Sequence, residues 1–553
     1  MNSKPTLAIY GIKDRHNFKY PGFTHDHNLC LMQNGNILQY LQLERFTRRK
    51  YDNRLDLFLE ELIENKKIKL PDEFDFVSVN SFVGNAFISA NGRIRFESAI
   101  KENLSTELEK GIGYYQNEIW EGKELQAFNC SHELAHIGSC LPFFGEFREN
   151  SLLISFDGSS SVSNFSAFHF TNGKMKLLES HWDLIYISKM FNNNALNFQI
   201  LGAKASEHCS VPGKLMGYAS YGIYNPKIEN WLKENDYFKE NWKNGNAIFQ
   251  SIKNTFGIRI ENFDNKNQFY QNVAATFQHI FERDFIQKIQ QLQKQTSSDY
   301  LYYAGGCALN IVTNTKIIET RIFKDVFIPP CCNDSGLSIG AAAFLEWKKG
   351  NKIQIHLPYL NNVGIEIPNN KVDNDLIEQT ANIILQGGII GVCNENAEVG
   401  PRALGNRSLL ALANNKEIAK KLSMEVKNRE WYRPVAPIML TEVARKVTQQ
   451  EVHHLAKFML LDFTIKEEFK NDLCGVIHAN QTARIQTISN ENDNPFIFKL
   501  LNYLHKKHNI LALINTSFNT QGEPIVHTPE NALVSAKQMN LQAVIINNKL
   551  YKI

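Results

Sequence analysis

The stretch Ser131-His132-Glu133-Leu134-Ala135-His136-Ile137-Gly138-Ser139 places two histidines four residues apart. If this segment is helical, both imidazole rings project from one face, because side chains at i and i+4 are neighbours on a helix. Such a pair is half of a metal site, and distant parts of the chain must supply the other ligands. Two carboxylates qualify because each stands where an apolar run breaks. Asp157 ends the run 152–156, and Asp334 follows the run 326–330.

A plan of strand, polar loop and Asn-Gly hairpin occurs twice in the chain. Residues 7–10 are predicted to be a strand, and the hairpin 28–43 turns at Asn34-Gly35. After the histidine pair, residues 152–156 are a second predicted strand, and a second hairpin turns at Asn172-Gly173. Asn-Gly between two extended runs is the strongest short-range hairpin signal. Two copies predict a duplicated α/β domain with a cleft between the copies. The alternative is two unrelated hairpins.

Length and composition are those of an ordinary globular protein with several domains. The chain has 553 residues, which is too long for one core and predicts two or three domains. A net charge of +3 requires neither a nucleic-acid nor a membrane partner, and no apolar run approaches the roughly 18 residues of a membrane helix. Nine cysteines without a CxxC pair predict mostly buried, reduced thiols. The first residues lack the pattern of a signal peptide, so we expect a cytoplasmic protein.

A glycine turn follows the predicted strand 300–303, where the sequence continues Ala304-Gly305-Gly306-Cys307-Ala308-Leu309-Asn310. Glycines between a strand and a helix let backbone N–H groups approach a phosphate or a sugar. The plainer alternative is chain geometry alone. Asn333-Asp334-Ser335-Gly336 opens another helix, in which Gly340 and the alanines after it permit close packing. The helices predicted here are 271–295 and 337–347.

Arginines gather in stiff loops beyond a domain boundary that we place at residues 350–375. The cations are Arg402 and Arg407 within 398–408, Lys427, Arg429 and Arg433 within 427–434, and Arg484 farther on. Residues 515–519 add small hydrogen-bonding side chains. Arginine forks and hydroxyls in turns suit a phosphate or a carboxylate. Pro401, Trp431 and Pro434 make these loops partly apolar, which favours a buried anion site over a solvated basic face.

These motifs resemble the O-carbamoyltransferases of the NodU/CmcH type. The block Gly400-Pro401-Arg402-Ala403-Leu404-Gly405-Asn406-Arg407-Ser408 is highly specific by itself, and residues 427–437 and 515–519 match two further blocks of that family. Earlier pieces agree in order and spacing, so the resemblance covers almost the whole chain. These pieces are His25-Asp26, Glu44-Arg45-Phe46-Thr47-Arg48, the histidine pair, Gly213-Lys214-Leu215-Met216-Gly217 and residues 304–310.

The resemblance implies two domains and two chemical steps. Residues 1–355 would form a duplicated actin-like ATPase domain of the ASKHA, ribonuclease H-like type, and residues 370–553 a YrdC-like α/β domain. In the second domain, ATP and carbamoyl phosphate would give carbamoyl-adenylate. The carbamoyl group would then pass to a hydroxyl of a small molecule, a natural product or a sugar, at a metal site in the first domain. We leave a homodimer open.

The resemblance also assigns residues to these steps. The metal, Fe(II) or another divalent ion, would be held by His132, His136, Asp157 and Asp334. Cofactor-binding residues would be Gly158, Ser159, Gly305, Gly306, Asn310, Gly336, Arg402, Lys427, Arg429, Arg433, Arg484, Ser517 and Asn519, with Mg2+ accompanying ATP. Forming a mixed anhydride joins two anionic reactants, so fixed cations must offset their repulsion. We therefore expect Arg402 and Lys427 to be catalytic, with His25 as the base for the acceptor hydroxyl.

Three other functions compete with this one. His132-Glu133-x-x-His136 is also the signature of a zinc metalloprotease with Glu133 as base, although its longer form would need glycine at Ser139 and histidine at Pro142. A tRNA threonylcarbamoyl-type enzyme would keep the fold, but the low net charge disfavours it. A catalytically idle binding protein is the third. We expect His453 and His454 to be a pair on a helix surface, and Cys331 and Cys332 to pack beside Asp334.

Overall fold

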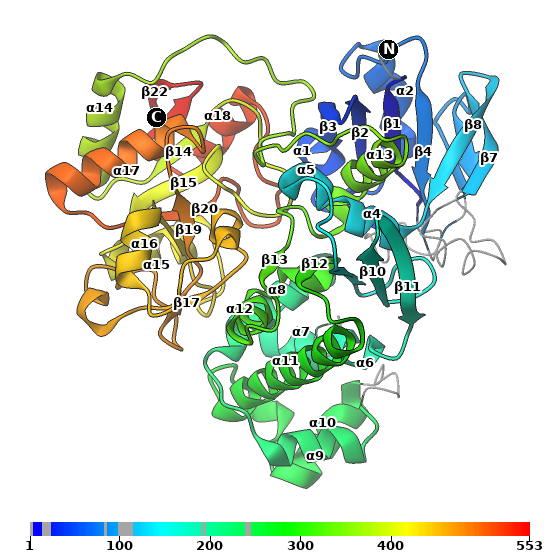
Figure 1. The fold of residues 1–553 in the computed structure, drawn as a ribbon. Coiled ribbons are helices and arrows are strands. Elements are labelled where there is room, and N and C mark those ends of the chain that lie inside the picture. Colours follow the sequence, from blue (N-terminus) through cyan, green and yellow to red (C-terminus); the bar gives the residue numbers. More distant parts are fainter. Residues whose placement is uncertain are drawn as a thin grey trace.

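The computed structural model describes residues 4–13, 24–81, 84, 86–97, 114–189, 191, 195–237 and 245–553. We call residues 4–348 the N-terminal region and residues 374–553 the C-terminal region. Residues 349–373, all of them described, contain no helix or strand and connect the two. In Figure 1 the C-terminal region lies on the left, and the N-terminal region fills the right and the bottom. Helices alternate with three large mixed sheets, which confirms the α/β class.

The first sheet of the N-terminal region contains the strand and hairpin expected near its start. Its strands, in spatial order, are β3 (Asn36–Gln42), β2 (Asn28–Gln33), β1 (Thr6–Tyr10), β4 (Asp75–Val79), β8 (Lys123–Cys130), β7 (Tyr114–Trp120), β6 (Arg95–Glu97) and β5 (Ala86–Ile88). The central β1 pairs antiparallel with β2 and parallel with β4. Asn34 and Gly35 both take positive φ between β2 and β3, which is the backbone that an Asn-Gly hairpin turn requires.

The second sheet repeats this plan. Its order is β11 (Lys174–His181), β10 (Phe165–Thr171), β9 (Ser151–Phe156), β12 (Tyr300–Ala304) and β13 (Asp325–Phe327). Its β9 pairs antiparallel with β10 and parallel with β12, as β1 does with β2 and β4. Asn172 and Gly173 again take positive φ at the hairpin. The duplication expected from the sequence repeat is therefore present in the strand order of the two sheets.

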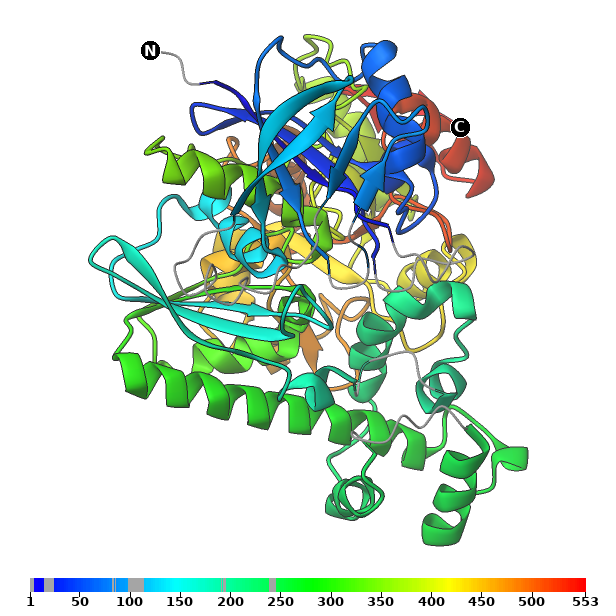
Figure 2. The same cartoon turned by 90° about the vertical axis from the view of Figure 1, so that its right-hand side faces the viewer.

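Helices cover the sheets and separate them. They are α1 (Leu43–Thr47), α2 (Leu55–Glu64), α4 (His132–Gly138), α5 (Leu141–Phe144), α6 (Ile185–Lys189), α7 (Ala195–Leu201), α8 (Val211–Ala219), α9 (Pro226–Glu234), α10 (Gly245–Phe256), α11 (Gln268–Thr296), α12 (Ile311–Glu319) and α13 (Leu337–Lys348). Figure 2 shows the long α11, in green, running beneath the second sheet. The periodicity of residues 271–295 predicted this helix to within three residues at its start and one at its end. Its buried stripe includes Phe277, Phe281 and Phe285, which join the core beneath β9.

Two helices of the N-terminal region cross in direct backbone contact. Helix α4 begins at Ser131, whose side chain accepts a hydrogen bond from the N–H of Leu134 and caps the helix. A Cβ added to Gly340 of α13 would lie 1.8 Å from the carbonyl oxygen of Ala135. A Cβ added to Gly138 would lie 2.3 Å from the carbonyl oxygen of Gly340. Only glycine at both positions allows α4 and α13 to approach this closely.

The C-terminal region is built around a seven-stranded sheet. Its order is β19 (Gln486–Ile488), β16 (Ala436–Leu440), β20 (Leu513–Ser517), β15 (Arg407–Leu412), β14 (Ile390–Cys393), β21 (Ala543–Ile546) and β22 (Lys549–Lys552), with β17 (Phe463–Thr464) and β18 (Thr482–Ala483) forming a separate pair. The helices are α14 (Asn374–Leu385), α15 (Lys416–Lys420), α16 (Thr441–Val447), α17 (Pro495–His508) and α18 (Pro529–Gln538). The short helical turns in the described part of the chain are η1 (Ala205–Ser210), η2 (Ile260–Asn262), η3 (Gly306–Leu309), η4 (Asp334–Gly336), η5 (Lys421–Val426), η6 (His454–Phe458) and η7 (Glu467–Phe469).

His453 and His454 differ from the expected helix-surface pair. The Nε2 atom of each ring lies 3.0 Å from Oδ1 of Asp325 in β13, so both join the C-terminal region to the N-terminal one. The Nδ1 atom of His453 accepts the N–H of Leu455, which leaves the proton on Nε2 and suits a hydrogen bond to the carboxylate better than a metal bond. Periodicity missed this contact because the partners lie far apart in the sequence.

The cysteines agree with the prediction of mostly buried, reduced thiols. All nine cysteines are free thiols, and six of them are buried. Cys331 and Cys332 are fully buried beside the turn that carries Asp334, as expected. Within the described residues, no helix combines the length and the apolar character needed to cross a membrane.

The crossing of α4 and α13 yields a stability prediction. Gly340→Ala should lower the free energy of unfolding by about 1–3 kcal/mol, because the methyl group forces the two backbones apart. Denaturant unfolding measures this. Gly213→Ala is the matched control, since a Cβ at Gly213 in α8 meets no atom within 4 Å, and it should leave stability equal or slightly higher. Equal stability of Gly340→Ala and wild type would show that the close contact is dispensable.

Candidate metal centre and anion site

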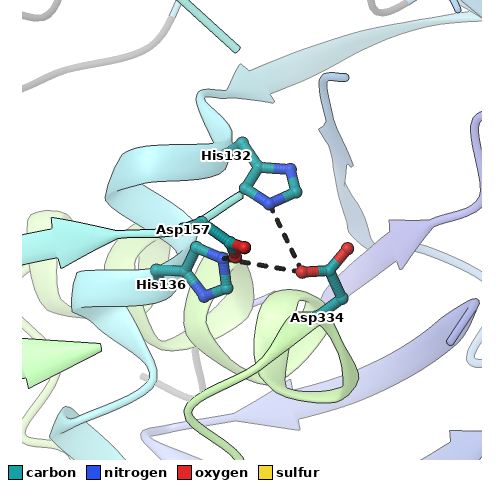
Figure 3. Close-up of side chains that lie close together, drawn as sticks. All are labelled: His132, His136, Asp157 and Asp334. Atoms are coloured by element: carbon teal, nitrogen blue, oxygen red, sulfur yellow. Dashed lines mark hydrogen bonds and ion pairs between the residues drawn. The ribbon is translucent and has the colours of Figure 1, made fainter. Parts of the chain in front are cut away.

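Four side chains from three distant segments converge in the N-terminal region (Figure 3). His132 and His136 project from α4, Asp157 follows β9, and Asp334 opens η4 before α13. One ligand atom from each residue lies within 4.8 Å of the others. His136 Nε2 is 2.9 Å from Oδ2 of Asp157, and His132 Nε2 is 3.6 Å from Oδ1 of Asp334. The structure thus brings together the four residues expected to be metal ligands.

The glycine turn after β12 holds one of these carboxylates. The N–H groups of Gly158 and Gly306 donate to Oδ1 and Oδ2 of Asp157. Gly305 has φ +102°, and a Cβ there would lie 2.1 Å from the carbonyl oxygen of Phe156. The turn therefore needs glycine both for its backbone conformation and for its contact with the end of β9.

The four residues fit a divalent cation. His132 is buried, and neither of its ring nitrogens has a hydrogen-bond partner, so the ring lacks the partner that a buried polar group needs. Burial disfavours the charged ring, but Asp334 and Asp157 outweigh it and raise the pKa of His132. His25 first, and then His132 and His136, hold the pKa of Asp334 well below its usual range in spite of burial. Two imidazoles facing two carboxylates are a donor set that iron, zinc or manganese accepts.

Two further residues orient Asp334 and were not foreseen from the sequence. The hydroxyl of Tyr10 in β1 donates to Oδ2 of Asp334 over 2.9 Å. The side-chain amide of Asn28 in β2 donates to the carbonyl oxygen of Asp334 over 2.9 Å and accepts the N–H of Ser338. Both belong to the first sheet, more than 300 positions away in the chain. The sequence indicated only that Tyr10 and Asn28 lie at the ends of two predicted strands, and it did not indicate that they contact Asp334.

Glu133 does not take the position of a metalloprotease base. Its side chain is fully buried, and its Oε1 atom accepts the N–H groups of Ser161 and Val162 at 2.9 and 3.0 Å. Glu133 therefore fixes the polar loop after β9. This geometry removes the support for the zinc-protease alternative, in which Glu133 would face a metal-bound water.

His25, expected to be the transfer base, lies on the loop before β2. Its Nδ1 atom is 3.0 Å from Oδ2 of Asp26, and its ring packs edge-on against Tyr51. Burial would lower the pKa of His25, but Cys209, Asp334 and Asp26 raise it well above its ordinary value. His25 therefore lies within electrostatic reach of the candidate metal centre.

A second group of predicted residues meets at the carboxyl end of β20. The Nζ atom of Lys427 donates to the backbone oxygen of Ser517 and to Oδ1 of Asn519, the latter over 2.9 Å. One Nη of Arg429 lies 3.5 Å from the hydroxyl of Ser517. Burial comes first among the causes that lower the pKa of Lys427, and neighbouring cations, Arg429 and Arg433 among them, add to it. Lys427 and Arg429 are therefore both in contact with Ser517, and Lys427 also contacts Asn519.

The other cations complete a group with excess positive charge, in which Lys427 is buried and the four arginines are half-buried. Burial lowers the pKa of Arg402 and of Arg484, and nearby arginines lower both further. The Nε atoms of Arg402 and Arg484 are buried without a hydrogen-bond partner. Repulsion between buried cations is costly unless an anion offsets it. We call Arg402, Lys427, Arg429, Arg433 and Arg484 the anion pocket.

Arg407 belongs to the same sequence block but has a different place. Its guanidinium donates to the carbonyl oxygens of His527, Asn394, Asn406 and Glu395. All of its nitrogens are therefore engaged within the chain, and it braces the loop that carries Arg402. The resemblance assigned Arg402, and not Arg407, to the site, whereas the glycine-rich setting that both share does not by itself separate them.

The anion pocket adjoins the candidate metal centre. Gly400 has φ +83°, and a Cβ there would lie 2.3 Å from the carbonyl oxygen of Pro330, four residues before Asp334. Arg45 of the N-terminal region donates to the carbonyl oxygen of Gly400 over 2.8 Å. Lys50 has its pKa lowered by burial first and then by Arg433 and Arg429 of the other region. The two sites therefore share one boundary.

The remaining predicted cofactor residues lie around Asp157 and Asp334. Ser159 is half-buried in the loop after Gly158. Asn310 caps α12 and exchanges two hydrogen bonds of 3.0 Å with Gln278 of α11, so its side chain is engaged within the chain. A Cβ on Gly336 would lie 2.1 Å from the carbonyl oxygen of Cys331. Their contact with a nucleotide stays a prediction.

Fold and site together define a two-region α/β protein with a candidate metal-ligand cluster beside a group of cations. The family model described as the carbamoyltransferase N-terminus matches residues 17–343, and the one described as the carbamoyltransferase C-terminus matches residues 381–552. The first match alone exceeds half of the 553 residues. The chain belongs to the carbamoyltransferase family, which confirms the NodU/CmcH-type resemblance.

Individual relatives agree over most of the chain. Nodulation protein NolNO of Sinorhizobium fredii is 26% identical over 96% of this chain and 79% of its own length. Nodulation protein U of Azorhizobium caulinodans is 24% identical over 90% of this chain and 92% of its own length. Among solved structures, full-length HypF in its phosphate- and nucleotide-bound form is 13% identical, with a TM-score of 0.34 over 64% of this chain and 57% of that chain. A score of this size does not define a shared fold.

The metal-ligand geometry gives a binding prediction. Adding Fe(II) or Mn(II) to metal-free protein should raise its Tm, because an ion bound only by the folded chain stabilises it. Asp334→Asn should weaken this binding by at least about tenfold, measured as the metal concentration needed for half of the Tm shift. Asp299→Asn is the control, because Asp299 pairs with Lys324 and does not belong to the ligand cluster, and it should bind as wild type does. Unchanged metal affinity in Asp334→Asn would exclude Asp334 as a ligand.

Proposed function

We propose that this protein activates carbamoyl phosphate with ATP in the C-terminal region and transfers the carbamoyl group to a hydroxyl of a small molecule in the N-terminal region. The observation that carries the proposal is the anion pocket, whose buried lysine and half-buried, mutually repelling arginines adjoin the candidate metal-ligand cluster in a carbamoyltransferase. We further infer an actin-like, ribonuclease H-like domain at residues 1–355 and a YrdC-like domain at residues 370–553. The duplicated sheet supports the first of these assignments.

The first step joins two anions. Water releases phosphate from carbamoyl phosphate, and an oxygen of the resulting carbamate attacks the α-phosphorus of ATP. The bond to pyrophosphate breaks, and carbamoyl-adenylate forms. Lys427 and Arg429 lie together at the end of β20, where they can face the α-phosphate, while Arg402 and Arg484 have buried Nε–H groups without partners. Such pre-oriented cations offset the charge that builds up in the transition state, and Mg2+ would accompany ATP.

The second step is attack on the carbamoyl carbon. The acceptor hydroxyl loses its proton to His25, its oxygen bonds to the carbamoyl carbon, and AMP leaves. Asp26 fixes the orientation of the His25 ring through the 3.0 Å contact at Nδ1, so Nε2 is the atom that faces the acceptor. A divalent cation held by His132, His136, Asp157 and Asp334 would polarise the carbamoyl carbonyl and offset the charge of Asp334 at His25.

The substrate is proposed to be a small molecule and not tRNA. A net charge of +3 over 553 residues is far from that of a protein built to bind a polyanion. The five cations of the anion pocket, one buried and four half-buried, suit a few phosphate groups and not an extended backbone. No observation on the described residues favours the tRNA alternative.

The first step predicts chemistry that needs no acceptor. Incubated with ATP and carbamoyl phosphate alone, wild-type protein should release pyrophosphate and form carbamoyl-adenylate, detected by mass spectrometry. Arg402→Ala and Lys427→Ala should each slow pyrophosphate release by roughly 100-fold, the loss typical of one removed transition-state contact. Arg445→Ala changes an exposed arginine of α16 and serves as the control. Unchanged rates in both pocket variants would place adenylate formation elsewhere.

The second step predicts that His25 acts only in transfer. With a hydroxyl acceptor found by screening sugars and natural products against wild type, His25→Asn should slow carbamoyl transfer by about 10²–10⁴-fold, because the hydroxyl loses its base. Pyrophosphate release without acceptor should stay unchanged. His508→Asn, at an exposed position near the end of α17, is the control. Full transfer activity in His25→Asn would remove this histidine from the mechanism.

A further inference from the structure

Lys214 of the N-terminal region forms a buried ion pair with the loop that carries two cations of the anion pocket. Lys214 lies on α8, and its side chain is only 2% exposed. Its Nζ atom lies 2.7 Å from Oε1 of Glu207 in η1 and 2.5 Å from Oε1 of Glu430 in the C-terminal region. One amine therefore holds a carboxylate from each region.

Glu430 is an acid among the cations of the anion pocket. It stands directly after Arg429 in the chain, and its Oε2 atom is 3.4 Å from an Nη of Arg433. Burial would raise the pKa of Glu430, but Lys214 first and then Arg433 outweigh it and lower the pKa. The carboxylate is therefore held in its charged form next to Arg429, which the proposed first step uses, and Arg433, another cation of the anion pocket.

We propose that Lys214 is a positioning residue of the anion pocket, which draws the Glu430 carboxylate onto its own amine and so leaves the forks of Arg429 and Arg433 available for the phosphate groups of carbamoyl phosphate and the adenylate. The inference deepens the proposed function and rests on it. It also assigns a role to the segment Gly213-Lys214-Leu215-Met216-Gly217, which the two-step chemistry leaves unexplained.

The reason lies in the competition between carboxylate and phosphate for the same donors. An arginine fork binds a carboxylate and a phosphate in the same planar, two-bonded way, so a free Glu430 would occupy Arg433 or Arg429. Lys214 offers a shorter contact than Arg433 does, 2.5 Å against 3.4 Å. Without the amine, two partly buried carboxylates would lose their partner, and the negative charge of Glu430 would act on any anion entering the pocket.

The place of Lys214 in the chain links it to both sites. Helix α8 follows directly after η1, and η1 carries Glu207 and Cys209. Cys209 is one of the groups that act on the pKa of His25. One short segment of the N-terminal region therefore reaches the transfer site at Cys209 and the anion pocket at Lys214. The anion pocket is thus completed by a residue outside the region that carries its cations.

Binding of inorganic pyrophosphate, measured by isothermal titration calorimetry on the full chain, tests the proposal. Lys214→Met should weaken binding by about tenfold, because Glu430 turns to the arginines and repels the anion. Glu430→Gln should bind as tightly as wild type or more tightly. The double variant Lys214→Met/Glu430→Gln should return to within about threefold of wild type, because the competing charge is gone. Lys214→Arg should stay close to wild type.

Two controls separate charge placement from folding. Lys288→Met removes a lysine that pairs with Glu179 on another part of the N-terminal region, and it should leave pyrophosphate affinity unchanged. The Tm of every variant is measured alongside. A purely structural clamp predicts that the double variant binds as weakly as Lys214→Met or more weakly, and that result would overturn the proposal. If wild type itself binds no pyrophosphate, the proposed function fails and this inference with it.

Discussion

The backbone contact between α4 and α13 is the constraint on which the candidate metal centre depends. His132 and His136 project from α4, whereas Asp334 stands at the start of α13. With Gly138 and Gly340 in contact, the two helix axes come close enough for the imidazoles to face the carboxylate. A larger residue at either glycine would separate ligands that are about 200 positions apart in sequence. The geometry of the site is therefore set by direct contact between two helix backbones, which cannot move closer without steric overlap.

A different physical principle governs the C-terminal region. Its pocket gathers cations whose pKa values are lowered by burial first and by repulsion from neighbouring arginines after it, as in Arg402, Arg429 and Arg484. Repulsion among these cations lowers the stability of the ligand-free fold. Binding of an anion restores that stability. Arg407 shows the contrast, because all of its donors end on backbone oxygens. Arg407, which braces the loop, thus differs from Arg402 and Arg484, each of which keeps a buried Nε atom without a hydrogen-bond partner.

Local signals in the sequence predicted much of this arrangement. The Asn-Gly turns, the i, i+4 histidine pair and the periodicity of α11 are short-range patterns, and each element formed where expected. The four candidate ligands met because strand ends and helix starts converge in a duplicated α/β plan. Residues whose role depends on partners far away in the sequence were not predicted. Asn28 and Tyr10 reach Asp334 from another sheet, and His453 finds Asp325 across the boundary between regions. No spacing rule encodes such contacts.

The shared boundary of the two sites allows the proposed transfer step to follow the proposed adenylate formation directly. Gly400 begins the block that carries Arg402, and it packs against Pro330, which shortly precedes Asp334. Lys50 and Arg45 of the N-terminal region reach the same boundary. A mixed anhydride of carbamate and AMP would hydrolyse in bulk water. The carbamoyl group therefore reaches the acceptor only if the acceptor site lies close to the site of adenylate formation and water is excluded from both. The contact at Gly400 places the two sites side by side, and Lys427 on one side and His132, His136 and Asp334 on the other are buried. The contact at Gly400 is thus a requirement of the proposed chemistry as well as of the packing, because separating the two regions would expose the intermediate before transfer.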